Sequence, residues 1–193
     1  RRFFSLCAGR CGQILDQESL ANDCDISHTT VKRWLSILEA SFQIILLKPY
    51  FKNFNKRIIK RPKLYFTDTG ILCYLLGIHS PKEIMTHPLK GAIFENYVIS
   101  SLFKSLIHHR ASAKLYYWRE SNKLEVDVLI EDGVHIDSYE VKASETFKSE
   151  HLRQVDKFKS IIKNVSLRHY GVFYAGEDSF EYKNNRVVSW RGL

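Results

Sequence analysis

Asp127, Glu140 and Lys142 are residues of the types that could hold a divalent cation and act on a phosphate group. Magnesium prefers oxygen ligands and is often held by one or two carboxylates, with water and phosphate oxygens completing its shell. A nearby lysine could steady the attacking water or the charge that develops on the phosphate. This chemistry requires all three side chains to lie on one face of a sheet.

A predicted β-hairpin would bring these residues together. Apolar and polar residues alternate through 124–130, as in a half-buried strand, and Asp132-Gly133 predicts a tight turn. If these two residues form the turn, Asp127 lies opposite Ser138 and diagonal to Glu140, with all three on one face. A loop one residue longer or shorter would separate the two acids. Exposed strands also carry such residues, so a solvated hairpin face is the alternative interpretation.

The composition is that of an ordinary globular protein. Hydrophobic residues make up 45% and charged residues 26% of 193 residues, enough for one large or two small domains. No apolar run approaches the length of a membrane span and the first residues are not a secretory signal, so we expect no membrane association. Four cysteines without paired spacing indicate reduced thiols and a cytoplasmic location. Because the chain begins with arginine, we expect it to be a fragment of a longer protein.

The net charge of +8 is concentrated in the first half of the chain. Residues 1–85 hold 13 lysines and arginines against seven acids, while residues 86–193 hold 16 against 14. Seven cations and no acid lie between residues 48 and 63, interleaved with aromatic residues, a pattern typical of nucleic-acid-binding surfaces. The alternative is a solvated loop beside an acidic partner domain. The seven cations are Lys48, Lys52, Lys56, Arg57, Lys60, Arg61 and Lys63.

Residues 1–85 have the element order of a winged helix-turn-helix. A short helix is expected from Gln17, and Ser27 is suited to cap a second helix over residues 28–40. That helix has an apolar stripe on one side and could read the major groove of DNA with the other. Strands are expected at residues 43–47 and 63–66, with the basic residues in the loop, or wing, between them. The groove-facing candidates are His28, Thr29, Lys32 and Arg33.

Structural interpretations compete with function elsewhere in this half. Cys7, Cys11, Cys24 and His28 could supply four zinc ligands, but thiols buried in the core are the simpler interpretation. Asp68 precedes a short helix and is expected to cap it. Winged helices also serve as protein-docking modules, so docking stays an alternative to DNA binding.

Residues 86–193 predict a second domain built on a mixed sheet. An amphipathic helix over residues 88–108 carries Glu95 at the margin of its apolar face. A later helix lies between two predicted strands, which implies a parallel crossover and the fold class α/β (α+β). Beside the hairpin, strands are expected at 115–119, 170–175 and 186–190, and the later helix at 149–163.

This half resembles the PD-(D/E)xK nuclease core shared by restriction enzymes and Holliday-junction resolvases. The resemblance covers roughly residues 88–175 and rests on a helix with an inward acid, then Asp127, then Glu140-Val141-Lys142. It implies a restriction-endonuclease-like fold in which Asp127 and Glu140 ligate Mg²⁺ or Mn²⁺ and Lys142 is the catalytic lysine. It further implies that Glu95 is the acid of the first helix and Gln154 a polar helper residue.

Nearly the whole chain also resembles the C-terminal region of prokaryotic AAA-type ATPases, a domain of unknown function. The matching segments include Leu35-x2-Leu38-Glu39, the run from Pro62 to Gly70, Gly91-x2-Phe94-Glu95 and Tyr117-Trp118-Arg119. The resemblance implies that an ATPase module is the partner of this region in the full-length protein. The chain contains no Gly-x4-Gly-Lys-Ser/Thr loop, so we do not expect it to bind ATP itself.

These features predict a protein that binds double-stranded DNA through residues 1–85 and hydrolyses phosphodiester bonds with magnesium through residues 86–193. Two alternatives stay open. In one, the nuclease fold is a non-catalytic DNA clamp. In the other, the chain is a protein-interaction module of the ATPase and contacts no nucleic acid.

Overall fold

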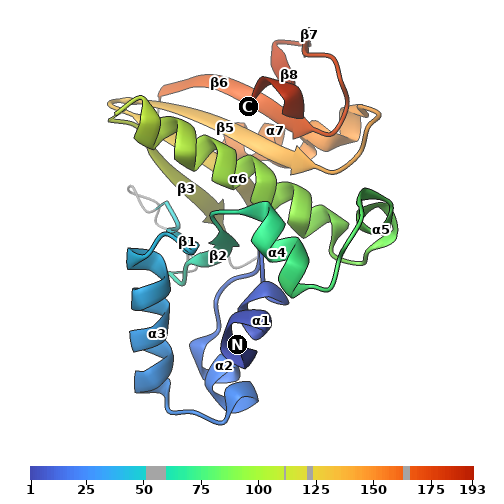
Figure 1. Cartoon of the computed structure of the whole chain (residues 1–193). Coiled ribbons are helices and arrows are strands. Elements are labelled where there is room, and N and C mark those ends of the chain that lie inside the picture. The colour runs from blue at the N-terminus through green and yellow to red at the C-terminus, as the bar shows by residue number, and fades with distance from the viewer. Residues whose placement is uncertain (51–59, 111, 121–123, 163–165) are drawn as a thin grey trace. The chain divides into compact units, whose positions relative to one another are not determined.

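The computed structural model describes residues 1–50, 60–110, 112–120, 124–162 and 166–193 (Figure 1). Its internal contacts divide the chain into two compact units. The first unit comprises residues 1–47 and 61–100, and the second comprises residues 48–60 and 101–193. The division falls within helix α6 (Lys90–His108), whereas the sequence analysis divides the chain at residue 85.

The first unit begins with three helices and a two-stranded antiparallel sheet. The predicted capped helix pair is confirmed, because Asp16 caps the first helix of the pair and the Ser27 hydroxyl accepts a hydrogen bond from the Thr30 backbone N–H at 3.2 Å. Asp25, in the left-handed conformation with φ of 55°, ends the first helix of the pair. The elements are α1 (Arg2–Ala8), α2 (Gln17–Cys24), α3 (His28–Ala40), β1 (Ile44–Leu47) and β2 (Lys63–Phe66).

Two short helices complete this unit before α6. The prediction that Asp68 is a cap is confirmed, since its carboxylate accepts a hydrogen bond from the Ile71 backbone N–H at 2.8 Å. This capped helix is α4 (Thr69–Leu75), and α5 (Pro81–Thr86) follows with proline at its first position, where no helical hydrogen bond is lost. The sequence analysis did not predict α1 or α5.

The predicted apolar buried face of α6 forms, with Ile93, Val98 and Ile99 buried. Asn96 is completely buried beside them. Its side-chain oxygen accepts hydrogen bonds from the Phe66 backbone N–H at 2.6 Å and from the Cys11 thiol at 3.3 Å, and its amide donates to the Thr69 hydroxyl at 3.1 Å. A buried amide is tolerated when its hydrogen bonds are made, and the bond from Phe66 joins α6 to β2.

The second unit contains a six-stranded mixed sheet in the order β3-β4-β5-β6-β8-β7 (Figure 1). The predicted mixed α/β architecture is therefore confirmed, with β5 parallel to β6 and β6 parallel to β8. At Gly171 in β6 a Cβ atom would lie 1.8 Å from the Arg186 carbonyl oxygen, so only glycine allows this pairing. The strands are β3 (Lys114–Arg119), β4 (Glu125–Asp132), β5 (His135–Lys142), β6 (Ser166–Tyr174), β7 (Phe180–Tyr182) and β8 (Asn185–Ser189).

The predicted hairpin forms, but its turn lies one residue later than expected. Asp132 pairs with His135, which leaves Gly133 and Val134 as the two turn residues. Gly133 has φ of +61°, as the first central position of a tight hairpin turn demands. Each residue of β4 therefore meets a partner two places further along β5 than predicted. A shift of two preserves the faces, because side chains alternate with a period of two.

A helical crossover covers one face of the sheet. A 3₁₀ turn, η1 (Ser149–Leu152), leads into α7 (Arg153–Ile161), which together form the helix predicted at 149–163. Phe158 of α7 packs on Trp118 of β3 with 5.0 Å between ring centroids, in a core that also includes Leu129 and Ile136. A second 3₁₀ turn, η2 (Trp190–Gly192), ends the chain. Among the described residues, no helix is both long and apolar enough to cross a membrane.

Candidate metal and nucleic-acid sites

Asp127 meets Glu140 and Val141 where the pairing of β4 with β5 ends. The last paired residues are Val128 and Tyr139, so the next backbone N–H groups of β5 are not bonded by that ladder. Asp127 Oδ2 accepts a hydrogen bond from the Val141 backbone N–H at 2.9 Å. The Asp127 carboxylate therefore takes the place of a strand carbonyl as the acceptor for β5, and it is fixed beside Glu140. The expected neighbour was Ser138, which instead pairs with Leu129 because of the shifted turn.

Glu140 is a buried acid with an unbalanced environment. Its residue is only 5% exposed, and its Oε1 accepts a hydrogen bond from Lys142 Nζ at 2.7 Å. Its Oε2 is buried and accepts no hydrogen bond from a donor group of the described residues, so its one polar interaction is a protonated contact with Asp127. Burial, followed by repulsion from Asp127, raises the pKa of Glu140 from 4.5 to about 9, although the Lys142 charge acts in the opposite direction. The pair of acids therefore retains a proton at neutral pH in this arrangement.

This arrangement is suited to receive a cation. A divalent ion would displace the shared proton, neutralise the repulsion between the acids and bond to Glu140 Oε2. Among the described residues, no group of three His, Cys, Asp or Glu side chains gathers to form a metal cage. The donor set is thus Asp127 and Glu140 alone, which fits magnesium better than zinc, because magnesium retains several water ligands.

Two further buried polar atoms lie on elements that pack together here. Ser138 lies two residues before Glu140 in β5, so both side chains are on the same face. The Ser138 hydroxyl is buried without a hydrogen-bond partner. Gln154 belongs to α7, which packs against β4, β5 and β6, and its Oε1 is also buried and unpartnered. Buried polar atoms are normally bonded, so such a concentration of exceptions is typical of a site that receives water or a ligand.

Glu95 is held within the first unit. Its Oε1 accepts hydrogen bonds from Lys63 Nζ at 3.0 Å and from the Tyr65 hydroxyl at 2.5 Å. Lys63 is 3% exposed and Tyr65 is completely buried, so both partners are fixed by β2. This cluster was not predicted from the sequence, where Lys63 counted among the cations of the basic surface. The available signal was the spacing of two between Lys63 and Tyr65, which places both on one side of the strand.

The predicted groove-facing side chains are exposed along one helix. His28, Thr29, Lys32 and Arg33 all lie in α3 and are all exposed. Trp34 and Ile37 of the same helix are also exposed, by 40% and 54%. Of the predicted wing residues, Lys60 and Arg61 are exposed, while Lys52, Lys56 and Arg57 lie outside the described residues.

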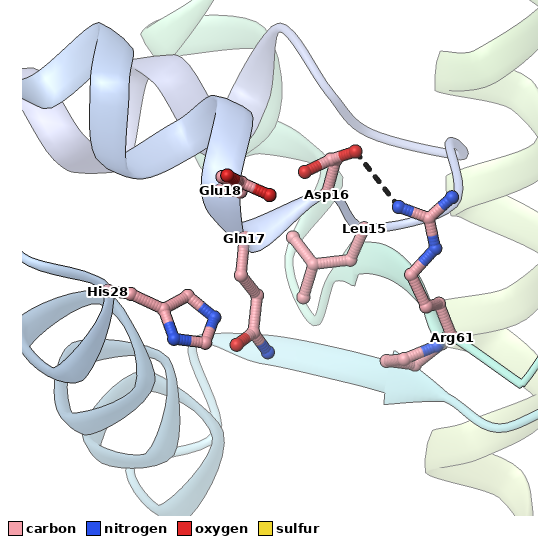
Figure 2. Close-up of a pocket in the computed structure, with 7 residues that line it drawn as sticks. Leu15, Asp16, Gln17, Glu18, His28 and Arg61 are labelled. Carbon is pink, nitrogen blue, oxygen red and sulfur yellow. Dashed lines mark hydrogen bonds and ion pairs between the residues drawn. The ribbon is translucent and has the colours of Figure 1, made fainter.

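His28 and Arg61 line one pocket of the first unit, of about 320 Å³ (Figure 2). Arg61 donates a hydrogen bond to Asp16 Oδ2 at 2.9 Å, drawn as a dashed line in Figure 2. Asp16 also caps α2 by accepting a hydrogen bond from the Ser19 backbone N–H. That hydrogen bond, followed by the one from Arg61, lowers the pKa of Asp16. The structure therefore brings the start of α3 and the end of the basic segment together around a fixed ion pair. Glu18, which also lines this pocket, adds a second acid.

Comparison with known proteins identifies the family of the second half. A family model described as a domain of unknown function, DUF4143, matches residues 90–193. The chain belongs to the DUF4143 family. DUF4143 is a domain associated with AAA ATPases. Another domain of unknown function, DUF8612, matches residues 1–82, so the two matches lie on either side of the residues between α5 and α6.

Two curated relatives match nearly the whole chain. Uncharacterised proteins of Mycobacterium tuberculosis and Mycobacterium bovis are each 31% identical to it over 188 residues, or 97% of the chain. The match covers 41% of each relative. The chain thus spans less than half the length of these relatives.

Proposed function

We propose that this DUF4143 chain is a DNA-binding module with a magnesium-dependent phosphodiesterase site, acting beside an ATPase module in a longer protein. The observation that carries the proposal is the cluster of Asp127, Glu140 and Lys142. Two buried acids there meet one cation, and the repulsion between the acids favours retention of a proton. One oxygen of Glu140 accepts no hydrogen bond from a donor group. Perturbed acids in such a setting are typical of functional sites.

Asp127 and Glu140 would hold the cation in the proposed site. When bound, magnesium supplies Lewis acidity and lowers the pKa of a coordinated water. Lys142 is 37% exposed at its side chain, so its ammonium can reach both Glu140 and an incoming phosphate. In this proposal the fold of the second unit is restriction-endonuclease-like, and Glu140 and Lys142 on β5 face the substrate while Gln154 approaches from α7.

The proposed DNA contact lies in the first unit. The pair α2 and α3 followed by the β1–β2 hairpin supports assignment as a winged helix-turn-helix, with the exposed polar side chains of α3 toward DNA. The net charge of the chain is +8, which favours a polyanionic partner. Double-stranded DNA is therefore the proposed substrate class.

A cleavage assay with a matched control tests the proposed activity. With Mg²⁺ or Mn²⁺ the chain is expected to nick or cut DNA, and Asp127→Asn is expected to abolish cutting while leaving DNA binding intact. Asp132→Asn, which removes an acid from the exposed end of the same strand, is the control and should retain cutting. Calorimetry should show cation binding to the unmodified chain but not to Asp127→Asn. If the chain neither cuts DNA nor binds a cation at this pair of acids, the proposal is overturned.

One observation favours a second candidate function. Trp34 and Ile37 place apolar surface on the helix proposed to read DNA, which is more typical of a protein-docking surface. In that case Trp34→Ser would weaken association with the ATPase module, and Lys32→Ala with Arg33→Ala would leave DNA affinity unchanged. If the variant with both Lys32→Ala and Arg33→Ala loses DNA affinity, the result would instead support the nuclease proposal.

A further inference from the structure

His151 is a buried histidine beside the proposed site that the sequence analysis did not select. It lies in η1, the turn between β5 and α7, and is only 9% exposed. Its Nδ1 accepts a hydrogen bond from the Lys148 backbone N–H at 3.3 Å. A ring nitrogen that accepts a hydrogen bond carries no proton, so in the neutral ring the hydrogen is on Nε2.

The position of the His151 ring is set by its surroundings. The Phe147 ring meets it edge to face, with 6.0 Å between centroids and 84° between planes. The next residue, Leu152, is anchored in an apolar cluster with Val172, Tyr174 and other side chains of the sheet. The turn η1 packs against β5 and β6. Because both the main chain and the ring are held, the direction of Nε2–H is fixed before any ligand arrives.

Lys142 lies at the end of β5 that η1 approaches, since it pairs with Tyr174 of β6, which shares an apolar cluster with Leu152. Burial, followed by the positive charge of Lys142, lowers the pKa of His151, which favours the neutral ring. The charged groups that act on the ring are Lys142, Lys148 and Glu150, and two of the three are positive. A neutral N–H donor beside an ammonium group presents only donors, and no acceptor, to an incoming molecule. That combination suits an oxygen atom that carries negative charge.

We propose that the Nε2–H of His151 and the ammonium of Lys142 form a pair of donors that binds a non-bridging oxygen of a phosphate group. This proposal rests on the function proposed above and extends it, because it assigns the phosphate-binding side of the site to residues outside the cation ligands. The ligand class is the phosphodiester of a nucleic acid, and inorganic phosphate shares the same chemistry. His151 is thus a substrate-binding residue, and its role does not require it to change protonation state.

Nuclear magnetic resonance of the histidine side chains tests the proposal directly. The free chain should show His151 as the Nε2–H tautomer. Inorganic phosphate should shift the Nε2 signal of His151 and leave that of His135 in place, since His135 is exposed at the other end of β5. Lys142→Met should abolish the shift, because it removes the second donor. A short DNA duplex then distinguishes nucleic-acid phosphate from free phosphate as the preferred source.

Two substitutions at residue 151 separate this role from a structural one. His151→Asn retains an acceptor for the Lys148 backbone N–H but lacks a group at Nε2, while His151→Gln places an amide donor near the position of Nε2. In DNA cleavage His151→Asn should raise KM about tenfold, the effect of one lost hydrogen bond to a charged group, and His151→Gln should recover most of that loss. His135→Asn is the matched control.

The outcomes for the phosphate pair and for the nuclease proposal are distinct. Asp127→Asn removes a cation ligand but should retain the phosphate-induced shift of His151, whatever its effect on cutting. A His151 signal that does not respond to phosphate or to the duplex, with or without Mg²⁺, would overturn the proposal. Equal shifts at His135 and His151 would do so as well, because they would indicate non-specific anion binding.

Discussion

Each unit of the chain contains a glutamate of low exposure bonded to a lysine, yet the two clusters differ in charge balance. In the first unit Lys63 and Tyr65 both donate to Glu95, so one cation and one neutral donor meet one acid. In the second unit Lys142 donates to Glu140, and Asp127 adds another negative charge at close range. Only the second cluster leaves a buried carboxylate oxygen without a donor.

Residue type alone does not distinguish a structural cluster from a reactive one. A lysine and a glutamate compensate one another when they are the only charges present, and the pair then fixes the packing of its elements. A second acid makes the cluster dependent on a proton or a metal ion. By this criterion Glu95 supports the fold of the first unit, and the catalytic role that the family resemblance implies for it stays a prediction.

The largest expected difference between the clusters is in stability. Lys63→Met leaves the Glu95 charge largely buried without its cation, which should lower the free energy of unfolding by about 3–5 kcal/mol. Lys142→Met should cost far less, because Glu140 already holds a proton at neutral pH and Lys142 is partly exposed. Denaturant unfolding of both variants, with exposed Lys114→Met as the control, measures the difference. Equal losses at Lys63 and Lys142 would contradict the comparison.

The second expected difference is in pH dependence, and it is specific to Glu140. Its pKa is about 9 in the folded chain against 4.5 for the free side chain, so the folded state binds the extra proton between these values. The free energy of unfolding should therefore fall as the pH rises through this range, because the folded state loses its extra proton. Glu140→Gln cannot titrate and should lose this contribution.

A pH series of denaturant unfolding curves measures this slope in both proteins. Added Mg²⁺ should restore stability to the unmodified chain at pH 8 and have no effect on Glu140→Gln, because the cation replaces the proton only where a carboxylate remains. Parallel curves for the two proteins would show that Glu140 does not carry the raised pKa.

The sequence predicted most helices and strands because their signals are local. The helix α3, with its Ser27 cap, and the paired strands β4 and β5 follow from capping and periodicity alone. The turn was misplaced by one residue, since Asp132-Gly133 and Gly133-Val134 both place glycine in a two-residue turn. The common face of Asp127 and Glu140 survived because the error moved the register by an even number.

The contacts of Glu95 and His151 could not be predicted from the sequence. Glu95 lies 30 or more residues from its partners, and no periodic pattern links α6 to the face of β2. The tautomer of His151 depends on a single backbone N–H in the preceding turn. The burial of Asn96 could not be predicted for a similar reason, because it depends on hydrogen bonds that only the folded unit supplies.

The smallest expected effect extends the comparison to an exposed pair, Asp16 and Arg61. Asp16→Asn retains a good cap for α2, because asparagine caps helices as well as aspartate, but it releases Arg61 from its ionic partner. If Arg61 lies beside DNA, affinity at low salt should rise, and the slope of log affinity against log salt should steepen by about 0.9. Fluorescence anisotropy with a labelled duplex over a salt series measures both quantities.

The exposed pair also has a matched control. Asp23→Asn removes the acid of another exposed pair, that with Arg10, which does not line the pocket with His28, and it should leave the salt slope unchanged. The double variant Asp16→Asn with Arg61→Ala should lose the gained slope, because the guanidinium that makes the contact is gone. If the double variant binds DNA as tightly as Asp16→Asn alone, Arg61 is not the residue that Asp16 holds back from DNA. The ion pair would then serve only to join the start of α2 to the residues before β2, as the balanced cluster of Lys63 and Glu95 joins α6 to β2.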